Sequence, residues 1–411
     1  YNGDEKEITN IYINNNTIDR HGGLFGLVGY CGEIKNVIIS GTIINNVMSA
    51  TGGIVGRNEG IIDNCVNNAN VENNLMTAGG ITGNNMNTVK NCTNNGNIIG
   101  SSVEGAGGIV GVSHTIADKI TNEPIIEGCT NSSIAKIEGT ANIGGICGYT
   151  YLSKITNCTN EGIVTASSSI AGGIVGQSSV DITYCKNKGE VKSNGNPDDP
   201  MNYQGTGGIA GKSTANISFS SNEGIIKSNG FYGGGILGLG GENTSVIQCY
   251  NKGSIEIEQN AAGGIVGKNA NTIWNCYNYL GEGKRIKGYM NVGGIMGTAN
   301  ETATYIGNCY SIGENIIGLS TASIIGSKGD NFDNIENCFC VDSTKLNAIG
   351  DNSYGSLESS GIYKKSINDF KLSKEDSNSV AYKLNELTTN KDRWTQKEEI
   401  NDGFPYLTYN Q

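Results

Sequence analysis

Twelve cysteines are the residues of this chain best suited to chemistry, because a thiolate can attack a substrate, bind a metal or form a disulfide. Metal sites usually show Cys-x-x-Cys pairs, and the sequence contains none. Instead, nine of the twelve follow one another at a nearly regular interval: Cys65, Cys92, Cys129, Cys158, Cys185, Cys249, Cys276, Cys309 and Cys338. This spacing predicts a ladder of reduced, buried thiols, in which cysteine serves as a small apolar side chain.

The other three cysteines, Cys31, Cys147 and Cys340, lie off that column. Cys338 and Cys340 would point to the same side of one strand, about 7 Å apart, which is too far for a relaxed disulfide. We therefore expect no disulfide framework.

Other catalytic side chains are sparse. The two histidines, His21 and His114, are not near a Ser or Cys nucleophile motif, so a catalytic triad is not supported. β-Helical lyases and hydrolases need clustered acids on one face, often with a basic residue, and no acidic residues form such a column here. The four arginines are widely separated: Arg20, Arg57, Arg285 and Arg393. The sequence therefore predicts a non-enzymatic chain without a required metal or cofactor.

Composition and charge argue against some classes of binding partner. The 411 residues carry a net charge of −11 and no basic cluster, so nucleic acid is not an expected partner. No apolar run approaches the roughly 20 residues that span a bilayer. The chain starts at Tyr1 without a signal peptide, so we expect a processed or excised piece of a larger protein.

A repeated sequence unit sets the spacing of the column cysteines. A Gly-Gly-aliphatic core recurs eleven times, beginning at Gly22, Gly52, Gly79, Gly107, Gly144, Gly172, Gly207, Gly234, Gly263, Gly293 and, in degenerate form, Ala322. Between the cores lie short β-branched stretches bounded by Gly and Asn, which are typical of strands. The pattern predicts an all-β, right-handed parallel β-solenoid of about 11 coils, with about 28 residues and three strands in each.

Three residue columns recur from coil to coil, and the first two should lie inside the solenoid. The first is an isoleucine ladder: Ile54, Ile81, Ile109, Ile146, Ile174, Ile209, Ile236, Ile265, Ile295 and Ile324. The second is the cysteine column, with Ser220 substituting once. Two residues later comes an asparagine column: Asn67, Asn94, Asn131, Asn160, Asn187, Asn222, Asn251 and Asn278. We expect these asparagines to occupy left-handed corners and to hydrogen-bond from coil to coil, and the glycines to allow positive φ and close approach.

The chain divides into three parts. Residues 1–20 offer one strand, residues 21–345 hold the repeats, and residues 346–411 change character. The last part has the spacing of one or two short helices, with Ser373 or Asp376 as N-caps, and should form a small mixed cap over the end of the solenoid.

The repeats resemble a known family. "GGIVGRNEGIIDNCVNNANV" and "GGIVGKNANTIWNCYNYLG" are similar to the GLUG-type repeats of bacterial cell-surface proteins, over roughly residues 8–340. The resemblance implies an adhesin-like β-solenoid, or an accessory region of a large surface peptidase. The HExxH signature of metallopeptidases is absent from this chain.

Breaks in the repeat supply candidate binding residues. Step lengths rise to 37 residues after Gly107 and to 35 after Gly172. The first insertion contains His114, which is either an exposed loop residue or functional. The second contains Asp198, Asp199 and Tyr203, where two carboxylates could bind calcium or simply be solvated.

An aromatic column gives a further candidate surface. Tyr250, Tyr277, Tyr310 and Phe339 each follow a column cysteine and should point outward. Such rings could stack on sugars. Alternatively, residues 356–411 cover them or the rings support one another, which is the interpretation we favour.

Together with the resemblance to GLUG-type repeats, the sequence predicts a non-enzymatic extracellular bacterial surface protein, an adhesin or stalk that presents a long surface to a glycan or to a protein of a host or neighbouring cell. The alternative is a spacer or filament subunit that self-associates end to end. A carbohydrate-active β-helix enzyme is a further alternative.

Overall fold

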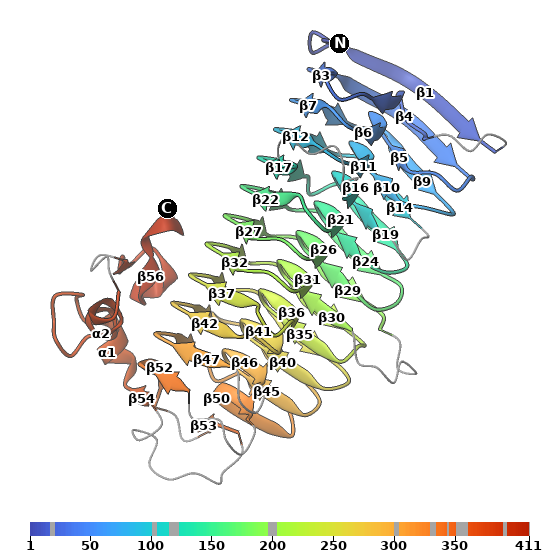
Figure 1. Cartoon of the computed structure of the whole chain (residues 1–411). Coiled ribbons are helices and arrows are strands. Elements are labelled where there is room, and N and C mark those ends of the chain that lie inside the picture. Colours follow the sequence, from blue (N-terminus) through green and yellow to red (C-terminus); the bar gives the residue numbers. More distant parts are fainter. Residues whose placement is uncertain are drawn as a thin grey trace.

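A computed structural model of the chain shows a long parallel β-solenoid of about eleven turns, with a small segment of helices and antiparallel strands at its C-terminal end (Figure 1). The predicted fold class is thus confirmed. The structure describes residues 1–16, 21–100, 105–114, 123–195, 204–299, 304–328, 334–342, 345–350, 361–388 and 393–410.

Three parallel sheets of 22, 21 and 11 strands form the walls of the solenoid. Apart from the strands at the two ends, each strand pairs with its counterparts in the coils before and after it, so the coils are held by the same backbone hydrogen-bond ladder. The 11-stranded sheet takes one strand from each coil: β3 (Glu33–Lys35), β7 (Ile61–Asp63), β12 (Thr88–Lys90), β17 (Ile125–Glu127), β22 (Lys154–Thr156), β27 (Ile182–Thr183), β32 (Ile217–Ser218), β37 (Ser245–Ile247), β42 (Thr272–Trp274), β47 (Tyr305–Gly307) and β51 (Ile335–Glu336).

A single coil contains five short strands rather than the three predicted, because two of its three walls are bent. The second coil runs through β5 (Thr51–Gly52), β6 (Val55–Asn58), β7, β8 (Val66–Asn67) and β9 (Asn70–Asn73). The Gly-Gly-aliphatic core separates β5 from β6. Asn67 bends the chain between β8 and β9, since its amide donates to the Ala69 carbonyl at 2.8 Å and accepts from the Ala69 N–H at 3.1 Å.

The core lies inside the three walls. Every member of the predicted isoleucine ladder is fully buried, as are the inward residues Ile62 and Val89 of the 11-stranded sheet. Full burial of one such side chain stabilises the fold by about 1.5–3 kcal/mol. Since a coil buries this surface only against its neighbours, the repeats must stack to be stable.

The asparagine column forms the predicted coil-to-coil hydrogen-bonded ladder, and the structure shows that it is buried. Each side-chain amide donates to the Oδ1 of the asparagine in the next coil at 2.8–2.9 Å, and the ladder ends where Asn278 donates to Ser311 Oγ at 3.3 Å. The prediction that these asparagines occupy left-handed corners is wrong. The left-handed residue is the one directly before each column cysteine, such as Asn64 with φ 51°.

Of the glycines in the Gly-Gly pairs, only Gly23 has a positive φ. The pairs are instead explained by the close approach of backbone atoms in the next coil. A Cβ on Gly173 would lie 2.2 Å from the carbonyl oxygen of Gly208 in the next coil and 2.3 Å from Cγ of Asn187. The second glycine of the pair therefore leaves room for both the next coil and the asparagine ladder.

The C-terminal part begins with strands that still belong to the solenoid. β53 (Asn347–Ile349) pairs with β50 (Ser320–Ser327), and β54 (Ile362–Lys365) pairs with β52 (Cys338–Val341). Stacking thus extends beyond residue 345, the expected end of the repeats.

A small cap follows β54. It consists of α1 (Ile367–Lys371), α2 (Val380–Glu386) and the antiparallel pair β55 (Trp394–Thr395) and β56 (Tyr406–Leu407). In Figure 1 it lies against one side of the solenoid.

The helix starts differ from those predicted. Ser366 caps α1 in a capping box with Asp369, and Ser379 caps α2 by accepting from the Ala381 N–H. Ser373 and Asp376 instead lie in the turn between the helices, where the Asp376 carboxylate accepts from the Asn378 N–H at 2.9 Å.

Candidate functional site

The aromatic column is present and tightly stacked. Tyr250, Tyr277, Tyr310 and Phe339 are register partners in successive coils. The Tyr250 and Tyr277 rings are 5.0 Å apart at an interplanar angle of 4°, and the Tyr277 and Tyr310 rings are 5.2 Å apart at 9°. The column forms because the same position of consecutive coils repeats every sheet spacing.

This column is not an open binding surface. All four residues are at most 5% exposed, because the cap packs over them. Trp394 lies 5.9 Å from the Tyr277 ring and 5.7 Å from the Tyr310 ring, and Phe370 lies 5.7 Å from Tyr310. These rings are therefore not available for sugar stacking, and the arrangement corresponds to the interpretation in which the C-terminal segment covers them.

Polar contacts hold the cap on the column. Tyr310 donates its hydroxyl hydrogen to the Pro405 carbonyl, and the side chain of Asn308 donates to the Leu384 carbonyl at 2.8 Å. Burial raises the pKa of Tyr250 to about 12, and it raises the pKa of Tyr310 well above its ordinary value. Both hydroxyls are therefore held neutral, which suits a structural contact.

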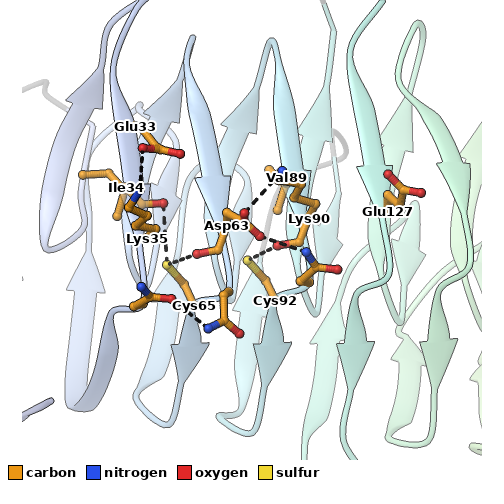
Figure 2. A network of polar contacts seen from close by, with 12 residues as sticks. Glu33, Ile34, Lys35, Asp63, Cys65, Val89, Lys90, Cys92 and Glu127 are labelled. Atoms are coloured by element: carbon orange, nitrogen blue, oxygen red, sulfur yellow. Dashed lines mark hydrogen bonds and ion pairs between the residues drawn. The ribbon is translucent and has the colours of Figure 1, made fainter. Parts of the chain in front are cut away.

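The nine column cysteines are buried with free thiols. Figure 2 shows two of them at the corner after the 11-stranded sheet: the Cys65 thiol donates to the Asp63 carbonyl at 3.3 Å, and the Cys92 thiol donates to the Lys90 carbonyl at 3.1 Å. Ser220 replaces cysteine by the same contact, since its hydroxyl donates to the Ser218 carbonyl at 2.8 Å.

The three remaining cysteines differ in exposure. Cys31 is exposed, whereas Cys147 and Cys340 are buried. Burial raises the pKa of the Cys340 thiol to about 11 and that of Cys147 well above its ordinary value, so neither is an activated nucleophile.

Charged side chains on the outer face form ion pairs between adjacent coils. Lys90 Nζ lies 3.3 Å from Asp63 Oδ2 (Figure 2), and Lys188 Nζ lies 2.7 Å from Glu161 Oε1. Within the described ranges, no group of three or more His, Cys, Asp or Glu side chains is placed to hold a metal ion.

The two insertions are only partly described. His114 directly follows β16 (Val110–Ser113) and is half-buried, with its Nε2 3.3 Å from Asn84 Nδ2. Asp198, Asp199 and Tyr203 lie outside the described residues, so the calcium interpretation stays a prediction.

Sequence reasoning missed a second aromatic pair. Tyr184 and Phe219 occupy consecutive left-handed corners, and their rings stack at 4.7 Å with an interplanar angle of 8°. The available signal was positional: most coils place asparagine directly before the column cysteine, and these two place an aromatic residue there.

Comparison with known proteins identifies one unit of the repeat. The GLUG motif matches residues 139–165, which comprise parts of one solenoid coil. The chain contains a GLUG motif. The predicted resemblance is thereby confirmed, and the GLUG motif spans β20 (Ile143–Gly144), β21 (Cys147–Thr150) and β22, together with the ladder residues Ile146 and Asn160.

Other comparisons add little to the GLUG match. No curated protein matches the chain. A solved structure from Bacteroides ovatus, named as a "putative immunoglobulin A1 protease", is similar over 92% of this chain and 78% of its own, with 16% identity and a TM-score of 0.25. In the part of the chain that the structure describes, no helix combines the length and apolar character needed to cross a membrane.

Proposed function

We propose that this chain is a non-enzymatic region of an extracellular bacterial surface protein, which acts as an adhesin or stalk and presents its long side to a glycan or protein. The observation that carries the proposal is the continuous buried ladder of asparagines across the coils. A ladder of this kind stiffens the part of the rod whose coils it joins, from Asn67 to Ser311. A stiff rod suits display of binding residues at a distance from the cell.

The GLUG motif at residues 139–165 supports the surface location, because the repeats resemble those of bacterial cell-surface proteins. The side chains with catalytic potential support the absence of an enzymatic role. The column thiols are buried against backbone carbonyls, and outward acids such as Asp63 and Glu161 are paired with lysines.

The test is to incubate the purified chain with polysaccharides, mucins and matrix proteins, and to record both retention and released products. We expect retention without products. Release of products would refute the non-enzymatic proposal, and absence of both signals would refute the adhesin and leave the stalk.

An end-to-end spacer is the second candidate, and the first coil favours it. The nine-residue strand β1 (Glu7–Asn15) has one parallel neighbour, β4 (Ile38–Asn45), and no partner on its outer edge among the described residues. Ile11, Ile13 and Phe25 are only partly buried at this end. An open edge strand with apolar neighbours can pair with another chain. Sedimentation that shows concentration-dependent rods, abolished by Ile11→Lys, would favour the spacer, and a monomer at all concentrations would exclude it.

A further inference from the structure

One corner of the solenoid has the same backbone conformation in every coil. The residue directly before the cysteine column is left-handed each time, with φ between 49° and 61°. These residues are Asn36, Asn64, Asn91, Gly128, Asn157, Tyr184, Phe219, Gln248, Asn275, Asn308 and Asn337. Each coil is thus an internal control for the others.

Asparagine and glycine fit this conformation, whereas a bulky aromatic residue is strained in it. Tyr184 and Phe219 are the two aromatic exceptions. Strain of this kind persists only where something compensates for it, and such positions concentrate at functional sites.

The cap compensates for Phe219 but not for Tyr184. The half-buried Tyr409 ring of the cap meets the Phe219 ring edge-on at 5.2 Å and 86°. Tyr184 stacks on Phe219 one coil further from the cap and remains 49% exposed. Tyr184 is therefore stacked on one neighbour, half exposed to solvent, and in a backbone conformation that strains a bulky residue.

A polar pair lies at the strands that follow these two corners: Lys186 in β28 (Lys186–Asn187) and Glu223 directly after β33 (Ser221–Asn222). Lys186, two residues after Tyr184, places its Nζ 2.7 Å from Glu223 Oε1, and both side chains are about one-third exposed. The Glu223 carboxylate also accepts from the Tyr250 hydroxyl at 3.3 Å. A surface ion pair of this exposure contributes little to stability, so its donor and acceptor can bind a ligand at small cost.

We propose that Tyr184, Lys186 and Glu223 form a binding site for a neutral pyranose sugar. The apolar C–H face of the pyranose packs on the Tyr184 ring, its hydroxyls donate to the Glu223 carboxylate, and its oxygens accept from the Lys186 ammonium. The net charge of −11 disfavours polyanionic glycans. This inference rests on the proposed function and names its ligand class and site.

The test uses the full chain and isothermal titration with cellohexaose, maltohexaose and chitohexaose as neutral probes, and with heparin as the polyanion. We expect at least one neutral hexasaccharide to bind and heparin not to bind. Tyr184→Asn should weaken that binding tenfold or more while leaving the melting temperature unchanged or higher, because asparagine is the residue that this corner otherwise carries. Tyr289→Ala, at a tyrosine that is 57% exposed elsewhere, is the matched control and should bind as the parent does.

The outcomes separate the site from the proposed function. Binding that survives Tyr184→Asn, or a Tyr184→Asn chain that melts lower than the parent, overturns the site, since the second result assigns Tyr184 a structural role. Binding of heparin alone overturns the ligand class. No binding of the neutral probes, with retention on mucins or matrix proteins, overturns the site and leaves the adhesin. No binding of the neutral probes and no retention on any of these materials overturns both the site and the adhesin, and leaves the stalk.

Discussion

Replacement of Asn160 by leucine should lower the free energy of unfolding of the solenoid substantially, although it barely changes the volume of the side chain. Leucine keeps the volume of the side chain but cannot hydrogen-bond. Three buried groups lose a partner: the Asn131 amide at 2.8 Å, the Asn187 Oδ1 at 2.8 Å and the Gly162 carbonyl at 3.0 Å. An unsatisfied buried polar group costs about 1–3 kcal/mol, so the expected loss is at least about 3 kcal/mol.

Asn95→Leu is the matched control. The side chain of Asn95 donates to Asn68 Oδ1 at the same 2.8 Å, but this pair is exposed to water, which can replace the lost bond. We expect its effect to stay within about 0.5 kcal/mol. Urea unfolding followed by circular dichroism, with hydrogen exchange at the mutated coil, measures both variants. Equal effects of the two substitutions would refute the claim that burial gives the ladder its contribution.

Three further predictions follow from the same contacts. Of the twelve thiols, only the exposed Cys31 should react with a thiol reagent in the native chain and all twelve after unfolding; rapid labelling of most thiols would contradict the buried column. Gly173→Ala, whose Cβ would lie 2.2 Å from the Gly208 oxygen, should destabilise by about 1–3 kcal/mol in thermal melts, whereas Gly29→Ala, with no atom within 4 Å, should not; similar melts would disprove the close-approach explanation. Burial raises the pKa of Tyr250 to about 12, so the contribution of its neutral hydroxyl to the stability of the cap should be full below pH 10. Above pH 10 the free energy of unfolding should fall by about 1.4 kcal/mol per pH unit. Tyr250→Phe should reduce this pH dependence, followed by Trp394 fluorescence, and an unchanged pH dependence would contradict the role of Tyr250.

Much of the fold was predictable because the contacts between coils of a solenoid join equivalent positions of the repeat, which recur at a regular spacing in the sequence. Spacing alone placed Ile54 and its counterparts in the core, the cysteines in a buried column and the asparagines in a hydrogen-bonded ladder. The prediction for the conformation of the asparagines was wrong, because asparagine is compatible with several roles. Asn64 turns the corner and Asn67 bonds to the next coil, and only the backbone distinguishes them.

The candidate surface was less predictable. Outward alternation correctly placed the column from Tyr250 to Phe339 on the outer side of its wall, but it did not decide whether those rings meet solvent. That depends on the cap, whose contacts join residues far apart in the chain, such as Tyr310 with Phe370 and Trp394. The same long-range contact explains Phe219, which meets Tyr409, and leaves Tyr184 as the exposed ring.

The sequence by itself thus determined the repeat, the number of coils and the identity of the buried columns, because each is a contact between equivalent positions of adjacent coils. Only the tertiary structure decided which outer columns are covered, which residues take the left-handed corner and why the second core glycine is needed. Those features depend on the close approach of backbones and on contacts between segments far apart in the chain, and neither produces a regularly repeated residue pattern in the sequence.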